Sequence, residues 1–383
     1  MNPRDLFGSD YNAFCERDPF NPQNEVEGFI SRKPNEYYGA LIITKINGKD
    51  VPEQLIMGSP KIHYPFDSLQ DGTRRYKFPV VRDIEIYEKL DGTNVLAYSY
   101  TDDLNLFYSF KTRLRPFLGS SKFGDFQSMW NEVGMPYLDN IKRVIRSNNC
   151  NLSFEVYGAR NPHLLMYKNP LDIALLFGVT NTGTILSPTA LGLAHRETYV
   201  PLDKLPLVAR FKVIDKDYVW NYESIQKELE AKLQKEEEGY YSGVEGTVWY
   251  LITIDGQCIQ FKCKPETIEA IHFSAGAGGL SKNVIVATCW NAFENMESPT
   301  VEFVKTLLIE EFAPEIVEAK HYLVEKSLAF VLSEMEFRLK ILDEYRKLDM
   351  NILLNKKEVM RSLSDKFAKN QMKKVYSLIV AYS

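Results

Sequence analysis

Residues 87–95 read YEKLDGTNV and place one lysine, Lys89, between a β-rich run and a tight turn. The run before Lys89, VRDIEIY, alternates polar with β-branched or aromatic residues. Shortly after Lys89 come an acid, a glycine and two small polar residues. A lysine charge is costly to bury, so its position at a strand end suggests a chemical role. The Lys-Leu-Asp-Gly tetrad alone is a weak signal, because Asp-Gly-Thr recurs at 71–73 without a lysine.

The composition is that of a globular chain: 45% of the 383 residues are hydrophobic and 13% are aromatic. That length accommodates one large core or two to three domains. The formal net charge of −5 excludes a uniformly basic nucleic-acid sleeve but permits local phosphate-binding patches. No apolar run approaches the roughly 20 residues that cross a bilayer, and MNPRDLFGSD lacks signal-peptide character. We therefore expect a soluble, cytoplasmic protein with no membrane partner.

The five cysteines and five histidines form no pattern typical of a metal site or a disulfide framework. The cysteines are scattered, odd in number and contain no Cys-x-x-Cys pair, which indicates buried thiols. Cys258 and Cys263 are close in sequence, but they lie in a strand-like segment with no histidine nearby. The histidines form no His-x-x-x-His pair, so we assign them no role.

Alternating apolar and polar residues predict short strands over 37–110, joined by turns such as NGKD and TDDLN. The apolar spacing becomes helical over 124–148, and a charged helix is expected at 223–238, with its KEEE end as a solvated face. Further strands are expected at 152–158, 174–179, 244–253 and 258–264. The first 270 residues therefore predict an α+β fold built on antiparallel sheets.

The pattern changes after the glycine-containing segment SAGAGGLSK at 274–282. This segment lacks the GK[ST] ending of a phosphate loop and no clear strand precedes it, so we interpret it as a linker. From about 298 onward, apolar residues recur at helical spacing, which predicts a separate all-helical domain. The apolar-striped segment 315–345 is either the core of that domain or a dimer surface.

Polar and aromatic residues recur in a set of segments after Lys89, most of them at strand ends. The segments are SFKTRLRP with Arg113, SFEVYG with Glu155, ALLFGV with Phe177, VEGTV with Glu245, and FKCK with Lys262 and Lys264. Taken singly, each is most simply a surface carboxylate, a core aromatic or a solvated lysine. Their joint occurrence in this order is the informative feature.

The ordered set resembles the covalent nucleotidyltransferases, which comprise ATP-dependent DNA and RNA ligases and mRNA capping enzymes. The resemblance covers roughly residues 50–270 and rests on the Lys-x-Asp-Gly, Glu-Gly and Lys-x-Lys elements. Lys-Leu-Asp-Gly-Thr-Asn is similar to RNA ligases, whereas DNA ligases and capping enzymes usually carry arginine two residues after the glycine. GSPKIHYPFD, at 58–67, also resembles the N-terminal extension of phage-type and archaeal RNA ligases, two subgroups between which the sequence does not choose.

The resemblance implies three parts. An antiparallel-sheet nucleotidyltransferase domain, an ATP-grasp-like ligase domain, is expected at 79–272. A β-rich extension at 1–78 packs on it, and an all-α domain follows at 285–383. DNA ligases and capping enzymes instead place an OB-fold barrel after the catalytic domain, so the helical end favours an RNA ligase.

The chemistry of such a site explains the residue types. A lysine attacks the α-phosphate of a nucleoside triphosphate only as a free amine, so its pKa has to be lowered by burial, cations or metal. Lys262, Lys264 and a divalent ion suit this task and also neutralise phosphate charge. The resemblance implies ATP with Mg²⁺ or Mn²⁺, a lysyl-AMP at Lys89, and Glu245 as the metal-linked carboxylate.

The resemblance also implies nucleotide-binding roles around the lysine. Asp91 and Gly92 would shape the turn that presents it, Glu155 would hydrogen-bond the ribose, and Phe177 would stack on adenine.

Three more residues belong to this nucleotide-binding set by resemblance. Arg113 would contact the ribose or the 5′-phosphate acceptor. Lys61 would meet the β- and γ-phosphates, or is an exposed loop lysine. Glu88, beside the nucleophile, completes the set.

RNA with 5′-phosphate and 3′-hydroxyl ends is the partner that the resemblance implies. Residues 351–383 contain seven basic residues against two acidic ones. Lys366, Lys369 and Lys373 are expected on one helix face, where they bind RNA phosphates or form an ordinary solvated face. Archaeal ligases pair through a region like 315–345, so a homodimer stands beside the core interpretation.

Three functions remain open from the sequence. The first is an ATP-dependent RNA ligase, of the kind used in RNA repair. The second is a DNA ligase or capping-type guanylyltransferase, which Asn94 and the missing OB pattern disfavour. The third is a catalytically silent RNA-binding module, which the intact Lys89, Glu245, Lys262 and Lys264 disfavour.

Overall fold

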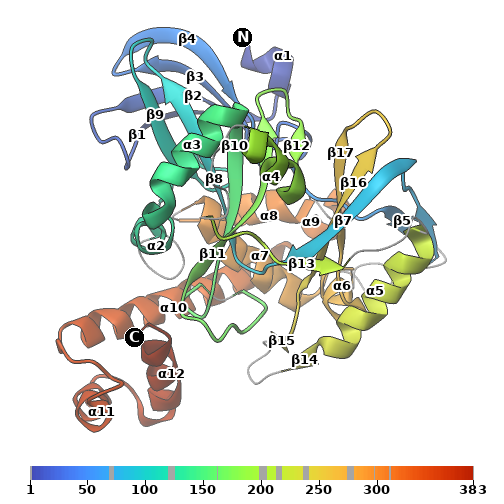
Figure 1. Ribbon diagram of the computed structural model, residues 1–383. Helices are drawn as coiled ribbons and strands as arrows, with labels where there is room; N and C mark the ends of the chain where they lie inside the picture. Colours follow the sequence, from blue (N-terminus) through green and yellow to red (C-terminus); the bar gives the residue numbers. More distant parts are fainter. Residues whose placement is uncertain are drawn as a thin grey trace.

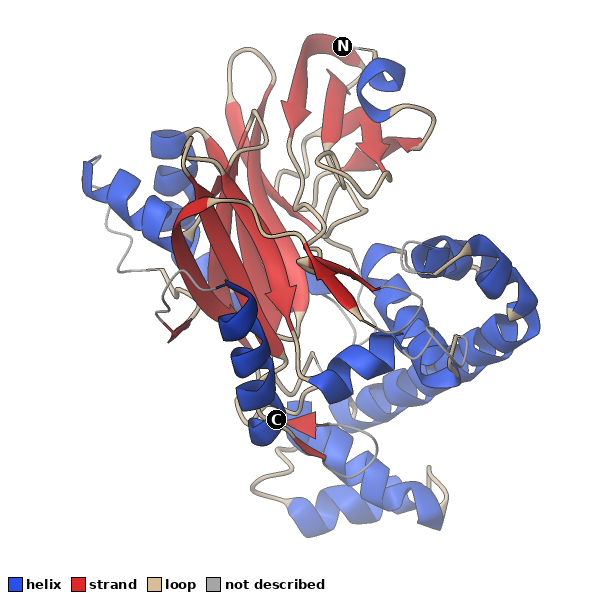
Figure 2. Cartoon of the chain, turned by 90° about the vertical axis from the view of Figure 1, so that its right-hand side faces the viewer, coloured by secondary structure: helices blue, strands red, loops and turns tan. Residues whose placement is uncertain are grey.

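The computed structural model describes residues 2–68, 73–119, 126–161, 163–197, 205–212, 218–235, 241–273, 280–296, 298–309 and 312–382. These residues form antiparallel sheets followed by helices, so the predicted α+β fold with a helical C-terminal part is confirmed. Figure 1 follows the chain from the blue strands at the top to the red helices at the lower left. In Figure 2 the strands fill the centre and top, and the helices lie at the flanks and base.

The N-terminal residues form a four-stranded antiparallel sheet in the order β1-β2-β3-β4. Helix α1 (Pro3–Phe7) precedes the strands β1 (Tyr11–Arg17), β2 (Glu25–Ser31), β3 (Leu41–Ile46) and β4 (Lys49–Ile56). Asn47 and Gly48 both have positive φ, at 54° and 72°, as a two-residue hairpin turn between β3 and β4 requires. Buried residues of this sheet pack against Tyr98 and Tyr100, which fixes it to the central sheets.

Two central sheets form the middle of the molecule. The five-stranded sheet has the order β12-β11-β10-β8-β9, and the four-stranded sheet has the order β13-β7-β16-β17. Their strands are β7 (Val81–Lys89), β8 (Thr93–Thr101), β9 (Leu106–Lys111), β10 (Cys150–Tyr157), β11 (Asp172–Thr180), β12 (Ile185–Leu186), β13 (Arg210–Lys212), β16 (Gly246–Thr253) and β17 (Cys258–Cys263). Because β7 and β8 belong to different sheets, the turn after Lys89 carries the chain across the seam between them.

Helices cover the outer faces of both central sheets. Helices α2 (Phe126–Val133), α3 (Leu138–Asn148) and α4 (Pro188–Glu197), with the 3₁₀ turn η1 (Met135–Tyr137), lie beside the five-stranded sheet. Helix α5 (Tyr218–Lys232) lies beside the four-stranded sheet, and α6 (Glu266–Phe273) contacts α5 and α7. Small two-stranded sheets pair β5 (Phe66–Ser68) with β6 (Arg74–Tyr76) and β14 (Gln234–Lys235) with β15 (Tyr241–Ser242). The strands and helices expected before residue 235 are therefore present, but the charged helix is shorter than the expected 223–238. Helix α5 ends at Lys232, Gln234–Lys235 form β14, and residues 236–238 lie outside the described residues.

The C-terminal helices contain two apolar cores. Their elements are α7 (Lys282–Asn295), α8 (Val301–Ile309), α9 (Pro314–Ala319), α10 (His321–Arg346), α11 (Lys356–Ser364), η4 (Lys369–Gln371) and α12 (Met372–Tyr382). One core joins α7 and α8 to the first half of α10, and the second joins the end of α10 to α11 and α12. Val324 and Ile341, from the apolar stripe, are both fully buried in these cores, so the stripe serves at least partly as core.

Two expectations about this region are corrected. The helices after the predicted linker begin at Lys282, earlier than the helical spacing expected from about 298. The first of them, α7, packs against α10. Lys366, Lys369 and Lys373 do not share a helix face: Lys366 follows α11, Lys369 opens η4 and Lys373 lies in α12. The chain leaves helical geometry at Ala368, with φ −62° and ψ 146°, after Phe367 has turned into the second core.

Most of the predicted linker, 274–279, lies outside the described residues, and the three-part division of the chain stays a prediction. In the parts of the chain that are described, no helix has the length and apolar character to cross a membrane.

Candidate active site

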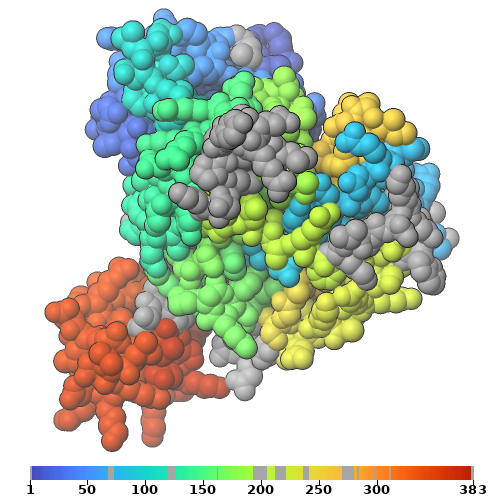
Figure 3. All heavy atoms as spheres, viewed as in Figure 1, coloured from blue at the N-terminus to red at the C-terminus, as the bar shows by residue number. Residues whose placement is uncertain are grey.

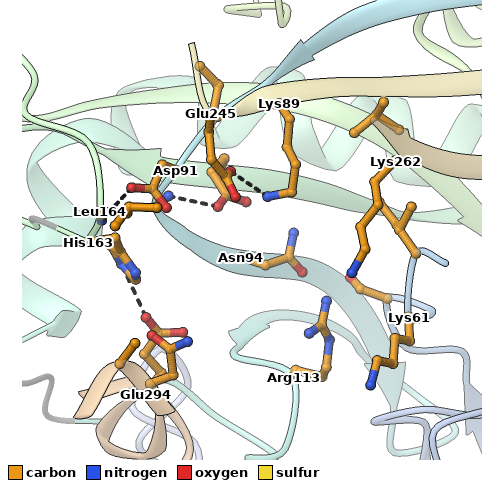
Figure 4. Close-up of a pocket in the computed structure, with 18 of the residues that line it drawn as sticks. Lys61, Lys89, Asp91, Asn94, Arg113, His163, Leu164, Glu245, Lys262 and Glu294 are labelled. Atoms are coloured by element: carbon orange, nitrogen blue, oxygen red, sulfur yellow. Dashed lines mark hydrogen bonds and ion pairs between the residues drawn. The ribbon is translucent and has the colours of Figure 1, made fainter. Parts of the chain in front are cut away.

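One pocket of about 430 Å³ lies where the two central sheets meet α7. Apart from the lysines of the C-terminal tail, every site residue predicted from the sequence lines it. These residues are Lys61, Glu88, Lys89, Asp91, Gly92, Arg113, Glu155, Phe177, Glu245, Lys262 and Lys264. Figure 4 labels Lys61, Lys89, Asp91, Arg113, Glu245 and Lys262 among them.

Lys89 and Lys264 share the carboxylate of Glu245. Nζ of Lys89 donates to one oxygen, Oε2, at 2.6 Å, and Nζ of Lys264 lies 2.6 Å from the other, Oε1. Strand pairing produces this arrangement, because Gly246 of β16 is opposite Lys89 at the end of β7, and β16 also pairs with β17. Side-chain exposure is 4% for Glu245, 7% for Lys264 and 24% for Lys89. Lys89 therefore remains the most accessible member of the group.

The charges of this group stabilise one another. Burial opposes ionisation of Glu245, but the two ammonium groups outweigh it and lower the pKa of the carboxylate to about 2. Burial also disfavours the charged form of Lys89, but Glu245 and Glu155 more than compensate and raise its pKa above the ordinary value. In this structure the pKa of Lys89 is thus raised and not lowered as expected, because its amine is a paired ammonium.

The turn after Lys89 is held by partly buried hydrogen bonds. Oδ2 of Asp91 accepts the backbone N–H groups of Leu164 and Leu165, each at 2.6 Å. The N–H of Gly92 donates to Oε1 of Glu155 at 3.1 Å, and a Cβ at Gly92 would lie 2.1 Å from the carbonyl oxygen of Val156. The close approach excludes any other residue at position 92 without movement of the backbone. Burial, with Glu245 nearby, raises the pKa of Asp91 to about 6.

Glu155 lies opposite Asn94 in the β10–β8 pairing and faces the same turn. Burial raises its pKa to about 8, which the charges of Glu294 and Glu245 reinforce and that of Lys89 opposes. Near pH 7 the carboxyl is therefore largely protonated and is able to donate as well as accept a hydrogen bond. Glu88 borders the pocket half-buried, and burial raises its pKa as well.

The pocket has an apolar side and a cationic side. Phe177 is 2% exposed and packs in the core together with Val248 and Tyr250, two further lining residues. It is thus both a core aromatic and part of the pocket wall.

The cationic side combines residues from separate segments. The backbone N–H of Lys262 donates to the carbonyl of His63 at 2.9 Å, which brings the segment containing Lys61 alongside β17. The guanidinium of Arg113 lies 5.3 Å from the centre of the Tyr38 ring, and its buried Nε has no hydrogen-bond partner among the described residues. Figure 4 shows Lys61, Lys262 and Arg113 on the side of the pocket away from Asp91.

The carboxylates of the pocket are better suited to bind a metal ion together with a ligand than to enclose the ion by themselves. Within the described ranges, no three or more His, Cys, Asp or Glu side chains are grouped to hold a metal ion. Mg²⁺ is commonly bound by one or two carboxylates together with substrate phosphates and water. Both oxygens of Glu245 pair with lysines, Oε2 with Lys89 and Oε1 with Lys264.

Several pocket residues were missed from the sequence. His163 lies 3.2 Å from Glu294 of α7, and Oγ1 of Thr93 donates to the same Glu294 oxygen at 3.1 Å. Trp290 and Arg338 also line the pocket, from α7 and α10. No sequence signal identified them, because α7 lacks a clear amphipathic period and a single histidine forms no motif.

Comparison with protein-family models and with curated proteins finds no match. Among solved structures, two forms of an archaeal ATP-dependent RNA ligase align with 89% and 90% of this chain and 78% of each of those chains. Their identities are 16% and 14%, and both TM-scores are 0.45. A Naegleria gruberi RNA ligase with PPi aligns over 51% of this chain and 53% of its own, at 16% identity and a TM-score of 0.35. Other Naegleria gruberi RNA ligase structures, with ATP or AMP and Mn, also match. The chain is thus similar to ATP-dependent RNA ligases of known structure.

Proposed function

We propose that this protein is an ATP-dependent RNA ligase that joins RNA 5′-phosphate and 3′-hydroxyl ends through Lys89. The observation that carries the proposal is the Lys89–Glu245–Lys264 group at the seam of the sheets. It lies in one pocket between an apolar wall suited to a base and a cationic wall suited to phosphates. The Lys-Leu-Asp-Gly-Thr-Asn turn supports RNA over DNA by resemblance.

In the first step, the lone pair of Lys89 Nζ attacks the α-phosphorus of ATP. A P–N bond forms, the bond to the bridging oxygen breaks, and pyrophosphate leaves. Lys61, Lys262 and Lys264 neutralise the charge of the phosphates, and Phe177 stacks on the adenine base. A bound Mg²⁺ or Mn²⁺ would add positive charge at the phosphates and would be held by them with Glu245.

Lys89 has to lose a proton before it attacks, and Glu245 is its nearest acceptor at 2.6 Å. While two ammonium groups surround it, Glu245 is a poor base, with a pKa of about 2. When the phosphates of ATP attract Lys264, the carboxylate loses part of the positive charge that stabilises its ionised form. It then becomes a better proton acceptor for Lys89.

Two further transfers complete the reaction. An oxygen of the RNA 5′-phosphate attacks the phosphorus of lysyl-AMP, the P–N bond breaks and the amine leaves, giving RNA capped by AMP through a 5′–5′ pyrophosphate. The RNA 3′-hydroxyl oxygen then attacks the 5′-phosphorus of that RNA. A phosphodiester forms and AMP departs with the bridging oxygen. Positioning and charge neutralisation provide most of the rate in both steps.

The test is incubation with α-labelled ATP and Mg²⁺, followed by a denaturing gel. Wild-type protein should retain label. Lys89→Ala and Lys89→Arg should retain none, because arginine keeps the charge but cannot act as the nucleophile. Glu245→Ala, Lys262→Ala and Lys264→Ala should each label more slowly. Wild-type labelling with Lys89→Ala would rule out the proposal, and labelling with α-labelled GTP but not ATP would point to capping chemistry.

A joining assay tests the substrate class. Strands with ribose at the 3′-hydroxyl end should be sealed, whereas all-DNA strands should not, because the 2′-hydroxyl distinguishes RNA from DNA. Equal sealing of both would reassign the protein as a DNA ligase.

A further inference from the structure

The pocket has a helical wall that the ATP chemistry does not use. Trp290, Asn291 and Glu294 of α7 line it, as does Arg338 of α10. None belongs to the ordered pattern that contains Lys89. The wall begins close to the reacting lysine, because Glu294 accepts a hydrogen bond from Thr93, the first residue of β8 after the Lys89 turn.

Arg113 lies at the junction between the central sheet and this wall. On one side of it, Oγ1 of Thr112 donates to the backbone carbonyl of Glu294 at 2.9 Å. On the other side, the N–H of Leu114 donates to Oδ1 of Asn295 at 3.1 Å. Two hydrogen bonds to the C-terminal end of α7 thus fix the backbone that carries Arg113. Since its buried Nε has no partner among the described residues, the guanidinium has a donor left for an anion.

The wall presents groups that recognise a nucleobase. The guanidinium carbon of Arg338 lies 5.0 Å from the centre of the half-buried Trp290 ring, and the exposed Asn291 adds an amide at the next position. Proteins bind unpaired RNA bases by stacking them on aromatic rings or guanidinium planes and by hydrogen bonds to their edges. The acidic group of the wall, Glu294, faces Thr93 and His163, and Figure 4 shows it on the far side of Arg113 from Lys61.

We propose that Arg113, Trp290, Asn291 and Arg338 form the binding site for the terminal nucleotide of the single-stranded RNA that carries the 5′-phosphate. Arg113 binds the phosphate, and the Trp290–Arg338 pair stacks on the base. The site adjoins the Lys89 turn, where the phosphate has to attack lysyl-AMP. This assignment rests on the proposed ligase function and specifies that the 5′-phosphate end of the RNA binds at the helical wall.

The test measures binding of a short single-stranded RNA, with and without a 5′-phosphate, to the full chain in the absence of ATP. Trp290→Ala and Arg338→Gln should weaken binding of the phosphorylated strand by about 5- to 150-fold, the range for losing one base-stacking side chain. Trp290→Phe should keep most of the affinity, because a ring remains. Arg113→Gln should remove the preference for the 5′-phosphate.

Tyr322→Ala is the matched control. Tyr322 is an exposed aromatic of the same helix α10 and also pairs with a cation, Lys326 at 5.8 Å, but it does not line the pocket. Its removal should leave RNA affinity unchanged.

Two results would overturn the assignment. One is RNA affinity at the wild-type level in folded Trp290→Ala and Arg338→Gln proteins. The other is a loss of ATP self-labelling as large as the loss of RNA affinity, which would place the wall in the ATP site. If wild-type protein does not label itself at all, the ligase proposal fails, whereas the binding comparison still reports on the wall by itself.

Discussion

Lys89, Glu245 and Lys264 form a buried group in which one carboxylate serves two ammonium ions. Removing one member of such a group leaves an unbalanced charge in a poorly hydrated place, which is far more destabilising than removing an exposed ion pair. The arrangement also keeps Lys89 protonated until a ligand redistributes the charges. A triphosphate has the negative charge that this requires, because it attracts both lysines and leaves Glu245 with fewer cations near it.

Glu155 provides a test of this electrostatic description at a single residue. Its pKa in the folded protein is about 8, against 4.5 for an ordinary glutamate, because burial favours the neutral form. The stability that this carboxyl contributes is therefore fully present below about pH 4.5 and is lost as the pH rises through 8. Glu155→Gln removes the titration. The free energy of unfolding of Glu155→Gln minus that of wild type should thus be larger at about pH 9 than at about pH 5. The increase should be about 1.4 kcal/mol for each unit by which folding raises the pKa of Glu155.

Urea unfolding at the two pH values measures this difference, with the exposed Glu36→Gln as the control. A difference between Glu155→Gln and wild type that does not change with pH would contradict a raised pKa.

The residues that the sequence identified are those whose chemistry restricts their type. A nucleophilic lysine, a glycine that admits no Cβ and lysines for phosphates recur in a recognisable order, and the structure brings Lys89, Gly92 and Lys262 into one pocket. Trp290 and His163 were not predicted from the sequence, because their place in the pocket depends on how α7 and the residues before Leu164 pack. No local pattern encodes that packing.

At the scale of elements, the end of β9 is fixed by a buried lysine that does not line the pocket. Lys111 is 1% exposed, and its Nζ donates to the carbonyls of Gly39, Thr112 and Arg113 at 2.9, 2.8 and 2.9 Å. Burial lowers the pKa of Lys111 to about 7, while three acceptors are satisfied in full only by the ammonium form. This side chain thus connects the N-terminal residues to the strand end that carries Arg113.

Lys111→Met should destabilise the protein by about 3 kcal/mol, because three buried carbonyls lose their donor. Chemical denaturation measures the loss, and Lys49→Met, at an exposed position in β4, is the control. A change in Lys111→Met no larger than that in the control would show that the connection contributes nothing.

Elements with a regular period were predictable, and α7 was not. The strands of the two sheets alternate in polarity or form short apolar runs bounded by turn residues, and they appear close to the expected ranges. Helix α7 reads KNVIVATCWNAFEN, with four β-branched residues and no charged face, so its period does not separate helix from buried strand. Apolar spacing predicted one helix through Lys366 and Lys369, but α11 ends at Ser364 and the following Phe367 is buried in the second core.

At the scale of the whole molecule, the C-terminal residues form a lobe that projects from the rest of the chain, at the lower left of Figure 3. Its second core joins the end of α10 to α11 and α12, while α7 and α8 stay near the pocket. A truncation at 285 would cut through α7 and remove a pocket wall. RNA binding by this lobe is therefore better tested by substitution.

Replacing Lys366, Lys369 and Lys373 together by glutamine should weaken RNA binding. All three are exposed, although they lie on different elements. If each contacts a phosphate, the slope of log affinity against log salt should become shallower by about 2, at about 0.7 per contact for single strands. Lys33, Lys45 and Lys49, around the N-terminal sheet, are the control set. An unchanged slope in the tail variant would identify these lysines as a solvated surface.

The most direct test of the central claim locates the covalent intermediate. Full-length protein is incubated with ATP and Mg²⁺ without RNA, digested under conditions that preserve a phosphoramide, and analysed by peptide mass spectrometry. We expect one adenylyl group on Lys89 and none on Lys61, Lys262 or Lys264, and release of that group when 5′-phosphorylated RNA is added. An adenylyl group on another lysine, or an unmodified Lys89 in protein that still joins RNA, would contradict the central claim.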